Sequence, residues 1–364
     1  MEAPEEVEEP DPEEMPTPPV VENFPVAPSL PNVIPRAMSW QPDPAEAVPP
    51  AGWRFMVSDL TLFRLNPVGL ETRVRIGMQK RLYYSEEAVE KNNFVFLGAF
   101  PRLNPASVHA GLGVEVQPMS ILNVRAFYNV QQYFGTFGFL QSFESPTANY
   151  SDSTLKALRD SQDRPPQTGQ LRQLSVQPLV QLKLGAVAVR ALFQFDYWQI
   201  ARVRDGSTTA YEPTVDTLLP DGGWTMSTDT DVLYTGRKGL AIGVRHSFVR
   251  PFYKQKHFAA TDATEAENQA AFAGYKGANS HQRVGLFAAY TFKDLGPSKF
   301  NKPTVILVAS WYGSHRYRTG VPDAGSEQPM DMGPAANENY VSRYMPYLVL
   351  GFAFESDFLS LMRR

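Results

Sequence analysis

Apolar and polar residues alternate strictly along residues 173–200, on both sides of a single glycine. Before Gly185 the apolar residues occupy even positions, and after it they occupy odd positions. Alternation with a period of two is typical of a β-strand with one apolar and one polar face. The segment therefore predicts a β-hairpin whose apolar face is formed by Leu174, Val176, Val180, Leu182, Leu184, Val187, Val189, Phe193 and Phe195.

The same alternation recurs along most of the chain from Gly52 onward. Long helical periodicity is absent, and only the alanine- and glutamate-rich stretch at 263–275 favours a short helix. The pattern predicts an all-β protein, an antiparallel up-and-down transmembrane β-barrel of about twelve strands, with ten or fourteen as alternatives. We place the strands at 53–64, 70–83, 93–103, 107–117, 121–133, 170–184, 186–199, 224–235, 239–250, 282–293, 303–315 and 343–355.

The connections between these strands fall into two length classes. Short and long connections alternate in the second half of the chain, as expected when all turns at one end of a barrel are short and all loops at the other are long. A soluble β-sandwich has no reason to segregate its loops in this way. The short connections are at 117–120, 185 and 235–239, and the long ones are at 134–169, 200–223, 251–281 and 316–342.

The apolar faces are of the right length to cross a bilayer. Each has five or six apolar positions, which corresponds to the roughly 9–11 residues of a strand tilted by about 45°. Alternation alone would also fit the core of a soluble β-rich protein, which is the alternative. Aromatic residues near strand ends favour lipid, because they predict interfacial girdles. The girdle candidates are Tyr133, Tyr197, Trp198, Trp224, Tyr234, Tyr290, Trp311, Tyr312 and Tyr347.

Over about residues 52–356 the chain resembles bacterial outer-membrane β-barrel proteins. The resemblance implies a location in the outer membrane, contact with outer-membrane lipid, and a periplasmic position for both chain ends. It departs from that family at the end of the chain, where Phe358 is followed by six residues instead of being terminal. Met1 is followed by acidic residues and no secretory signal is visible. We therefore expect that a signal peptide was removed; a cytoplasmic protein is the alternative.

Residues 1–50 differ in composition from the rest of the chain. They contain eleven acidic residues, one base (Arg36), fourteen of the 31 prolines and no glycine. This segment has a net charge of −10, which leaves +6 for residues 51–364 because the whole chain has −4. Such a segment cannot bury enough apolar surface to fold alone, and proline extends it. We predict a disordered, acidic, proline-rich tail at 1–51 and a barrel domain at 52–364.

The tail has three possible roles. It can be a passive spacer, it can fold back into the barrel as a plug, or it can reach periplasmic or envelope protein partners through residues 1–50. The basic barrel interior predicted below would favour the plug by charge attraction.

Charged residues on the predicted polar faces point into the barrel interior. Bases outnumber acids there, which would bias a water-filled pore towards anions. The alternative is that these charges form ion pairs and close the interior. Eight strands leave a filled interior and about sixteen leave an open channel, so about twelve predict a narrow or plugged pore. The lumen-lining candidates are Arg73, Arg75, Arg81, Glu115, Arg125, Lys183, Arg190, Asp196, Arg245 and Arg283.

Catalytic, metal-binding and cofactor-binding motifs are lacking in the sequence. The chain has no cysteine, which excludes disulfides and thiolate metal sites. Some twelve-stranded outer-membrane barrels are phospholipases, but His246 and Ser247 are adjacent on a strand and point to opposite faces. Asn279-Ser280-His281 is the other candidate for such a site. Because these motifs are lacking, we expect neither enzymatic activity nor a cofactor. We also expect no nucleic-acid partner, because the basic residues are dispersed along strands instead of forming one patch.

Two functions remain for such a barrel. The first is a narrow channel for small polar solutes, anion-biased or plugged. The second is a non-conducting outer-membrane anchor or subunit of a larger envelope assembly, of the secretion or gliding-motility type, whose N-terminal tail contacts periplasmic partners.

Overall fold

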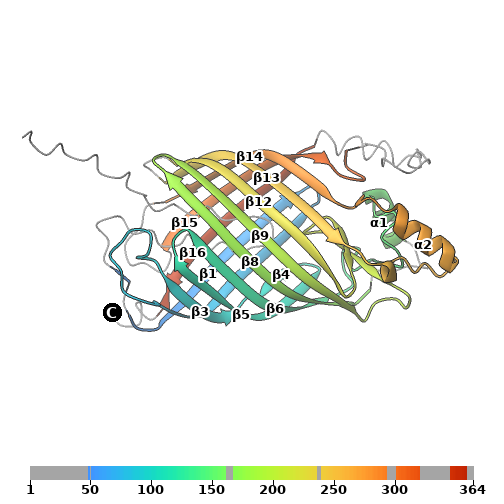
Figure 1. The fold of residues 1–364 in the computed structure, drawn as a ribbon, viewed down its shortest axis with the longest axis horizontal. Helices are drawn as coiled ribbons and strands as arrows, with labels where there is room; N and C mark the ends of the chain where they lie inside the picture. The colour runs from blue at the N-terminus through green and yellow to red at the C-terminus, as the bar shows by residue number, and fades with distance from the viewer. Residues whose placement is uncertain are drawn as a thin grey trace, which may run out of the picture.

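The computed structural model describes residues 48–49, 51–160, 167–235, 239–292, 301–319 and 345–358. A closed barrel dominates the structure (Figure 1). Its strands are β1 (Arg54–Leu65), β2 (Gly69–Lys80), β3 (Phe94–Ala99), β4 (Arg102–Asn104), β5 (Ser107–Met119), β6 (Leu122–Tyr133), β8 (Gln170–Leu184), β9 (Val187–Ala201), β12 (Gly223–Thr235), β13 (Leu240–Phe252), β14 (His281–Thr291), β15 (Asn301–Ser314) and β16 (Tyr347–Asp357).

All neighbouring wall strands are antiparallel, and β1 pairs with both β2 and β16, which closes the barrel. Since β3 and β4 lie along the same stretch of wall between β2 and β5, the barrel has twelve strands, which confirms the predicted number. The predicted strand 93–103 is interrupted at Phe100-Pro101, because a proline has no N–H to donate to the ladder.

The two ends of the barrel differ, as the loop lengths predicted. Helices α1 (Asp152–Asp160) and α2 (Glu265–Gly274) lie at the long-loop end, together with the 3₁₀ turn η1 (Gln255–His257). The helix predicted at 263–275 is therefore confirmed; Thr264 caps it by accepting a hydrogen bond from the Glu267 amide. Within the described residues, no helix is long and apolar enough to span a membrane.

The opposite end carries the short β5–β6 and β8–β9 turns and both ends of the described barrel chain, whereas the equally short turns at 66–68 and 105–106 lie at the long-loop end and depart from the predicted segregation. Gly185 lies in the two-residue β8–β9 turn with a φ of 59°, a conformation that favours glycine. The segment 81–93 is an exception to the short turns. It folds around Asn93, whose side chain accepts hydrogen bonds from the amides of Leu82 and Tyr83 and donates to the carbonyl oxygens of Tyr83 and Glu90.

The outer face of the wall is apolar, as the alternation predicted. In the hairpin β8–β9, the side chains predicted to face lipid point outward, and Leu184 is 60% exposed. The polar side chains between them are buried inside the barrel. A closed barrel pairs the backbone groups of its wall strands, as hydrocarbon requires. The closed wall and its continuous apolar exterior define a transmembrane β-barrel.

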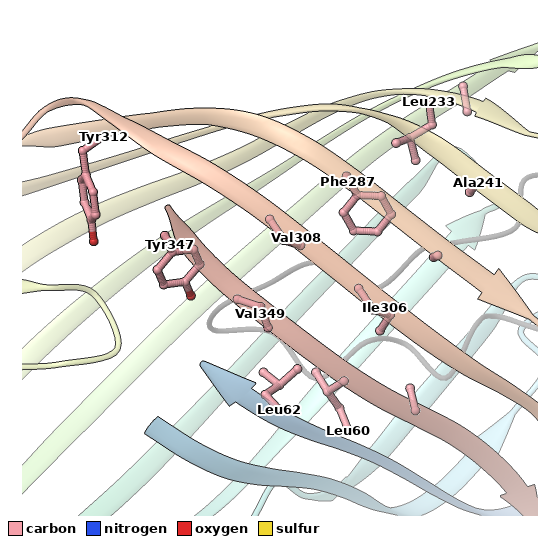
Figure 2. Packing of buried hydrophobic residues seen from close by; sticks show 13 residues of the cluster. Leu60, Leu62, Leu233, Ala241, Phe287, Ile306, Val308, Tyr312, Tyr347 and Val349 are labelled. Atoms are coloured by element: carbon pink, nitrogen blue, oxygen red, sulfur yellow. The ribbon is translucent and has the colours of Figure 1, made fainter. Parts of the chain in front are cut away.

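The inner face is not uniformly polar. One sector of the wall, formed by β1 and β12 to β16 with one residue of β9, carries an apolar cluster on its inner side (Figure 2). Its members are Leu60, Leu62, Ala188, Leu233, Ala241, Phe287, Ala289, Ile306, Val308, Tyr312, Tyr347, Val349 and Ala353. A second inner cluster, of Met56, Phe94, Phe96, Phe100 and Phe127, lies on β1, β3, β6 and the link between β3 and β4. These clusters fill part of the interior with side chains instead of water.

Candidate functional site: the barrel interior

One network of buried charges joins β2, β5 and β6. The Glu115 carboxylate accepts hydrogen bonds from Arg75 Nε at 3.0 Å and from Arg125 Nη2 at 3.1 Å. Its other oxygen accepts from Asn123 Nδ2 at 3.0 Å. The Arg75 guanidinium also lies 3.5 Å from the centre of the Phe96 ring. We call these residues the Glu115 network.

A second network joins β9, β12 and β13. The Asp231 carboxylate accepts hydrogen bonds from Arg190 Nε at 2.9 Å and from Arg245 Nε at 2.6 Å. Arg245 also lies 3.8 Å from the Asp229 carboxylate and 4.7 Å from the centre of the Phe287 ring. We call these residues the Asp231 network.

In both networks one carboxylate lies between two guanidinium groups. All of these side chains are buried, and a buried ion is tolerated only when other groups satisfy its charge and hydrogen bonds. Because the guanidinium groups are already paired with carboxylates, their attraction for a passing anion is reduced. The sequence left open whether the interior charges line a pore or close it, and the geometry favours closure.

A third polar cluster lies nearer the long-loop end. Arg73 Nε donates to Glu71, while its Nη1 and Nη2 have no partner among the described residues. Arg102 lies opposite Arg73 on the ladder and donates from Nη2 to Gln173 Oε1 at 3.1 Å, which joins β4 to β8. This contact crosses two intervening strands and therefore runs through the interior.

A hairpin that the sequence did not predict lies in the mouth at the long-loop end. Strands β10 (Thr209–Glu212) and β11 (Thr217–Pro220) pair with each other, and β10 also pairs with β7 (Ser142–Phe143). Every residue of β10 and β11 is buried. We call residues 209–220 the plug hairpin.

Two acidic residues hold the plug hairpin against the wall. Glu212 accepts hydrogen bonds from Tyr133 and Gln131 on β6. Asp216 accepts from Arg318 Nε at 2.5 Å and from the Tyr312 hydroxyl on β15 at 2.7 Å. The hairpin leaves the wall between β9 and β12, so these contacts tie it to β6 on one side and to β15 on the other.

The Asp216 carboxylate is ionised despite its burial. Burial alone would raise its pKa, but the charges of Arg318 and His315 hold the pKa well below its usual range. The negative charge is therefore a permanent part of the contact between plug and wall.

The sequence placed the plug hairpin inside a loop at 200–223 because both of its strands are too short for a clear alternation. Strands β10 and β11 have four residues each, and both of their faces are buried, so they show no alternation with a period of two. The one available signal was a turn-forming stretch, Pro213-Thr214-Val215-Asp216, between two β-favouring runs.

The structure places nine of the ten lumen-lining candidates on the inner face. Arg81 is the exception and requires a correction. Strand β2 ends at Lys80, so Arg81 leaves the wall, donates to the Pro49 carbonyl oxygen and lies 5.2 Å from the Tyr84 ring centre. Those on the inner face, all buried, are Arg73, Arg75, Glu115, Arg125, Lys183, Arg190, Asp196, Arg245 and Arg283.

Four girdle candidates are also corrected. Tyr133, Trp198, Tyr312 and Tyr347 are buried inside the barrel. Each has the parity of the inner face of its strand, which outweighs its position near the strand end. Trp198 Nε1, for example, donates to Thr225 Oγ1 at 2.9 Å.

The other girdle candidates lie on the outer face. Trp224, Tyr234, Tyr290 and Trp311 are exposed, and the rings of Tyr197 and Trp224 lie 5.3 Å apart on neighbouring strands. These positions suit the interface between lipid and water.

The histidines weighed as catalytic candidates lie apart. Ser247 is buried on the inner face, whereas His246 is half-buried on the outer face, where it contacts Gln282 at 3.3 Å. His281 is buried beside His315, with ring centres 4.9 Å apart. No group of three or more His, Asp or Glu side chains in the described ranges could hold a metal ion.

No protein-family model and no curated protein matches the sequence. Solved structures that resemble the fold include the NanC porin, with 8% identity, a TM-score of 0.33, and coverage of 83% of this chain and 98% of that chain. The translocator domain of autotransporter NalP from Neisseria meningitidis has 10% identity, a TM-score of 0.34, and coverage of 84% and 87%. CdiB from Acinetobacter baumannii has 11% identity, a TM-score of 0.32, and coverage of 84% and 60%.

The assignment of the fold rests on the strand pairing, the apolar exterior and the asymmetric loops, not on these likenesses. Together these features are those of bacterial outer-membrane β-barrels, with an interior occupied by paired charges, apolar clusters and a plug hairpin.

Proposed function

We propose that this protein is an outer-membrane barrel that is closed to solutes in the conformation described and anchors an envelope assembly. The observation that carries the proposal is the occupied interior. The Glu115 network, the Asp231 network and the plug hairpin come from different parts of the wall and lie in one lumen.

A conducting pore needs a continuous water-filled path with ion sites weak enough to release their ion. The charged side chains of the Glu115 and Asp231 networks are instead buried and paired. This geometry supports a closed barrel over an open channel. The anchoring role rests on the composition of residues 1–50.

The N-terminal tail is the part of the chain that we propose contacts the partner. Residues 1–47 lie outside the described residues, and the proposal rests on their composition. A segment with a net charge of −10 over residues 1–50 suits a basic surface on a periplasmic protein. The chain enters β1 at the short-turn end, which is the periplasmic end of such barrels.

Two measurements test the proposal. Purified full-length protein in planar bilayers should give no ohmic single-channel current, and a steady conductance would contradict the closed barrel. A detergent pull-down with full-length protein should recover a stoichiometric periplasmic protein that protein lacking residues 1–50 does not recover. Recovery of the same protein by both forms would contradict the role of the tail.

Membrane insertion is tested separately. A folded barrel should migrate differently on gels with and without heating in detergent. If the protein is soluble without detergent and does not change mobility on heating, the location in the outer membrane is wrong whatever the pull-down shows.

A further inference from the structure

A cavity of about 530 Å³ lies at the long-loop end of the barrel. The β1–β2 turn, the turn before β5, helix α1 and the tip of the plug hairpin border it. Ligand sites in proteins typically have volumes of about 300–1,000 Å³. The proposed anchor function does not involve this cavity.

One side of the cavity meets the apolar exterior of the barrel. Phe63 and Leu70 are paired across β1 and β2, face outward, and line the cavity. Val68 in the adjoining turn and Phe137 in the facing loop also line it, and they are 72% and 69% exposed. Phe137 has a φ of 57°, a conformation that strains an aromatic residue and that holds its ring at this surface. The cavity therefore opens beside the lipid-facing belt.

A buried cation also lines the cavity, within reach of the charges of Glu71 and Glu212. Arg64 is 5% exposed, donates from Nη1 to the Pro213 carbonyl oxygen at 3.3 Å, and has no described partner at Nε. A Cβ at Gly69 would lie 2.8 Å from Arg64 Nη2. Glycine at this position therefore leaves room for the guanidinium group.

Helix α1 adds two cations to the same cavity. Lys156 and Arg159 are three residues apart and therefore lie on one face of the helix, next to the apolar side chain of Leu155. Both are exposed. Arg159 also pairs with the exposed Asp160 at 2.8 Å.

The two acidic residues that line the cavity have partners of their own. The Asp152 carboxylate accepts hydrogen bonds from Arg318 at 2.9 and 3.0 Å. Glu212 accepts hydrogen bonds from Tyr133 and Gln131, as described above. Three cations therefore line the cavity against two acids: the charge of Asp152 is paired with Arg318, whereas the hydrogen-bond partners of Glu212 are neutral and its charge acts on Arg64.

We propose that this cavity binds a single-chain amphiphile with an anionic head group, taken from the surrounding membrane. Arg64, Lys156 and Arg159 contact the carboxylate or phosphate, and the acyl chain lies along Phe63, Leu70 and Phe137 towards lipid. Each buried methylene would contribute to binding through the hydrophobic effect. The site requires the membrane barrel but is independent of whether the barrel conducts.

Native mass spectrometry of the full-length protein, released from a non-ionic detergent, tests the site. The probes are palmitate with a carboxylate head, palmitoyl lysophosphatidic acid with a phosphate head, and hexadecanol with neither. We expect a one-to-one adduct with at least one anionic probe and little with hexadecanol. The comparison of palmitate with the lysophospholipid identifies which head group the cations prefer.

Two variants and a matched control make the test specific. The double variant Lys156→Glu/Arg159→Glu should lower the adduct fraction by about tenfold, as expected for the loss of two favourable charge contacts. Leu155→Trp reduces the space in the cavity beside helix α1 and should lower the adduct fraction without changing the net charge. Lys254→Glu/Lys276→Glu is the control, because it makes the same change in net charge at two exposed cations of the same end that do not line the cavity.

Each variant must first show the heat-dependent gel mobility of the folded barrel. Equal adducts with hexadecanol and with the anionic probes would overturn the anionic head group. No adduct, or adducts of equal fraction in all folded variants, would overturn the site itself.

Discussion

Asp231 on β12 and Arg245 on β13 lie directly opposite each other on the ladder and are joined by two parallel hydrogen bonds inside the barrel. Arg245 Nε donates to one carboxylate oxygen at 2.6 Å and Nη2 donates to the other at 2.8 Å. This fork geometry is the strongest arrangement for such a pair. It fixes a charge pair across two strands in a place where a porin would hold water.

Replacing Asp231 by asparagine should destabilise the barrel strongly. The change leaves the buried guanidinium groups of Arg190 and Arg245 without their shared anion, at a cost of about 3–5 kcal/mol. The measurement is the urea midpoint of the change in heat-dependent gel mobility. Asp160→Asn is the control, since its pair with Arg159 is exposed and should contribute little to stability. Equal midpoints for both variants would show that the Asp231 network does not support the wall.

An arginine on the outer face should be tolerated near the membrane edge but not at its centre. Phe193→Arg places a charge in the middle of the apolar belt, because Phe193 pairs with Thr228, midway between the outward-facing Trp224 and Tyr234, and should cost about 2–4 kcal/mol. Gln199→Arg, on the outer face of the same strand near the long-loop end, should cost about 0–1 kcal/mol. Gln181→Arg is a poor control, because Gln181 lies opposite Arg190 in the interior. Folding yields into vesicles measure the difference, and equal yields would mean that the faces are assigned wrongly.

The plug hairpin should remain in place under mildly acidic conditions. The pKa of Asp216 is held well below its usual range in the folded protein. Its stabilising contribution is therefore complete above the unfolded-state pKa of about 3.9 and is lost as pH falls through the lower folded-state value. Protease cleavage within residues 209–220 should thus be constant from pH 7 to about pH 5.

The same experiment on Asp216→Asn isolates the carboxylate. This variant should be cleaved faster at neutral pH, because Arg318 and Tyr312 lose their ionised acceptor. Its cleavage should approach that of the parent only in strong acid. A parent plug that opens near pH 5 would contradict the depressed pKa.

Gly243 on β13 should not accept a side chain. A Cβ there would lie 1.9 Å from the Val232 carbonyl oxygen and 2.8 Å from Leu233 Cα, which are backbone atoms of the paired strand β12. Relief requires a shift of the ladder, so Gly243→Ala should destabilise by about 1–3 kcal/mol or more. Gly52→Ala, which would meet nothing within 4 Å, serves as the control. Matching unfolding midpoints for the two variants would exclude this steric restriction.

The strands and the outer face of the barrel could be predicted from the sequence. A barrel strand is apolar towards lipid and polar towards the interior, so its apolar residues recur at every second position, as in the hairpin Gln173–Ile200. This period shows which side chains face outward. The same alternation also indicates that Trp198 and Tyr312 point inward. Their positions near strand ends led instead to the prediction that they belong to the aromatic girdles. The inner apolar cluster around Phe287 was less visible, because β15 and β16 are apolar on both faces.

The contacts made inside the barrel were decided by tertiary structure. Alternation places Glu115, Arg75 and Arg125 on inner faces, but only the barrel curvature and register bring one carboxylate between two guanidinium groups. The plug hairpin is short, buried on both faces and held by partners about 80 to 100 positions away along the chain, such as Tyr133 and Arg318. Local periodicity determines which way a side chain points, whereas long-range register determines what it meets there.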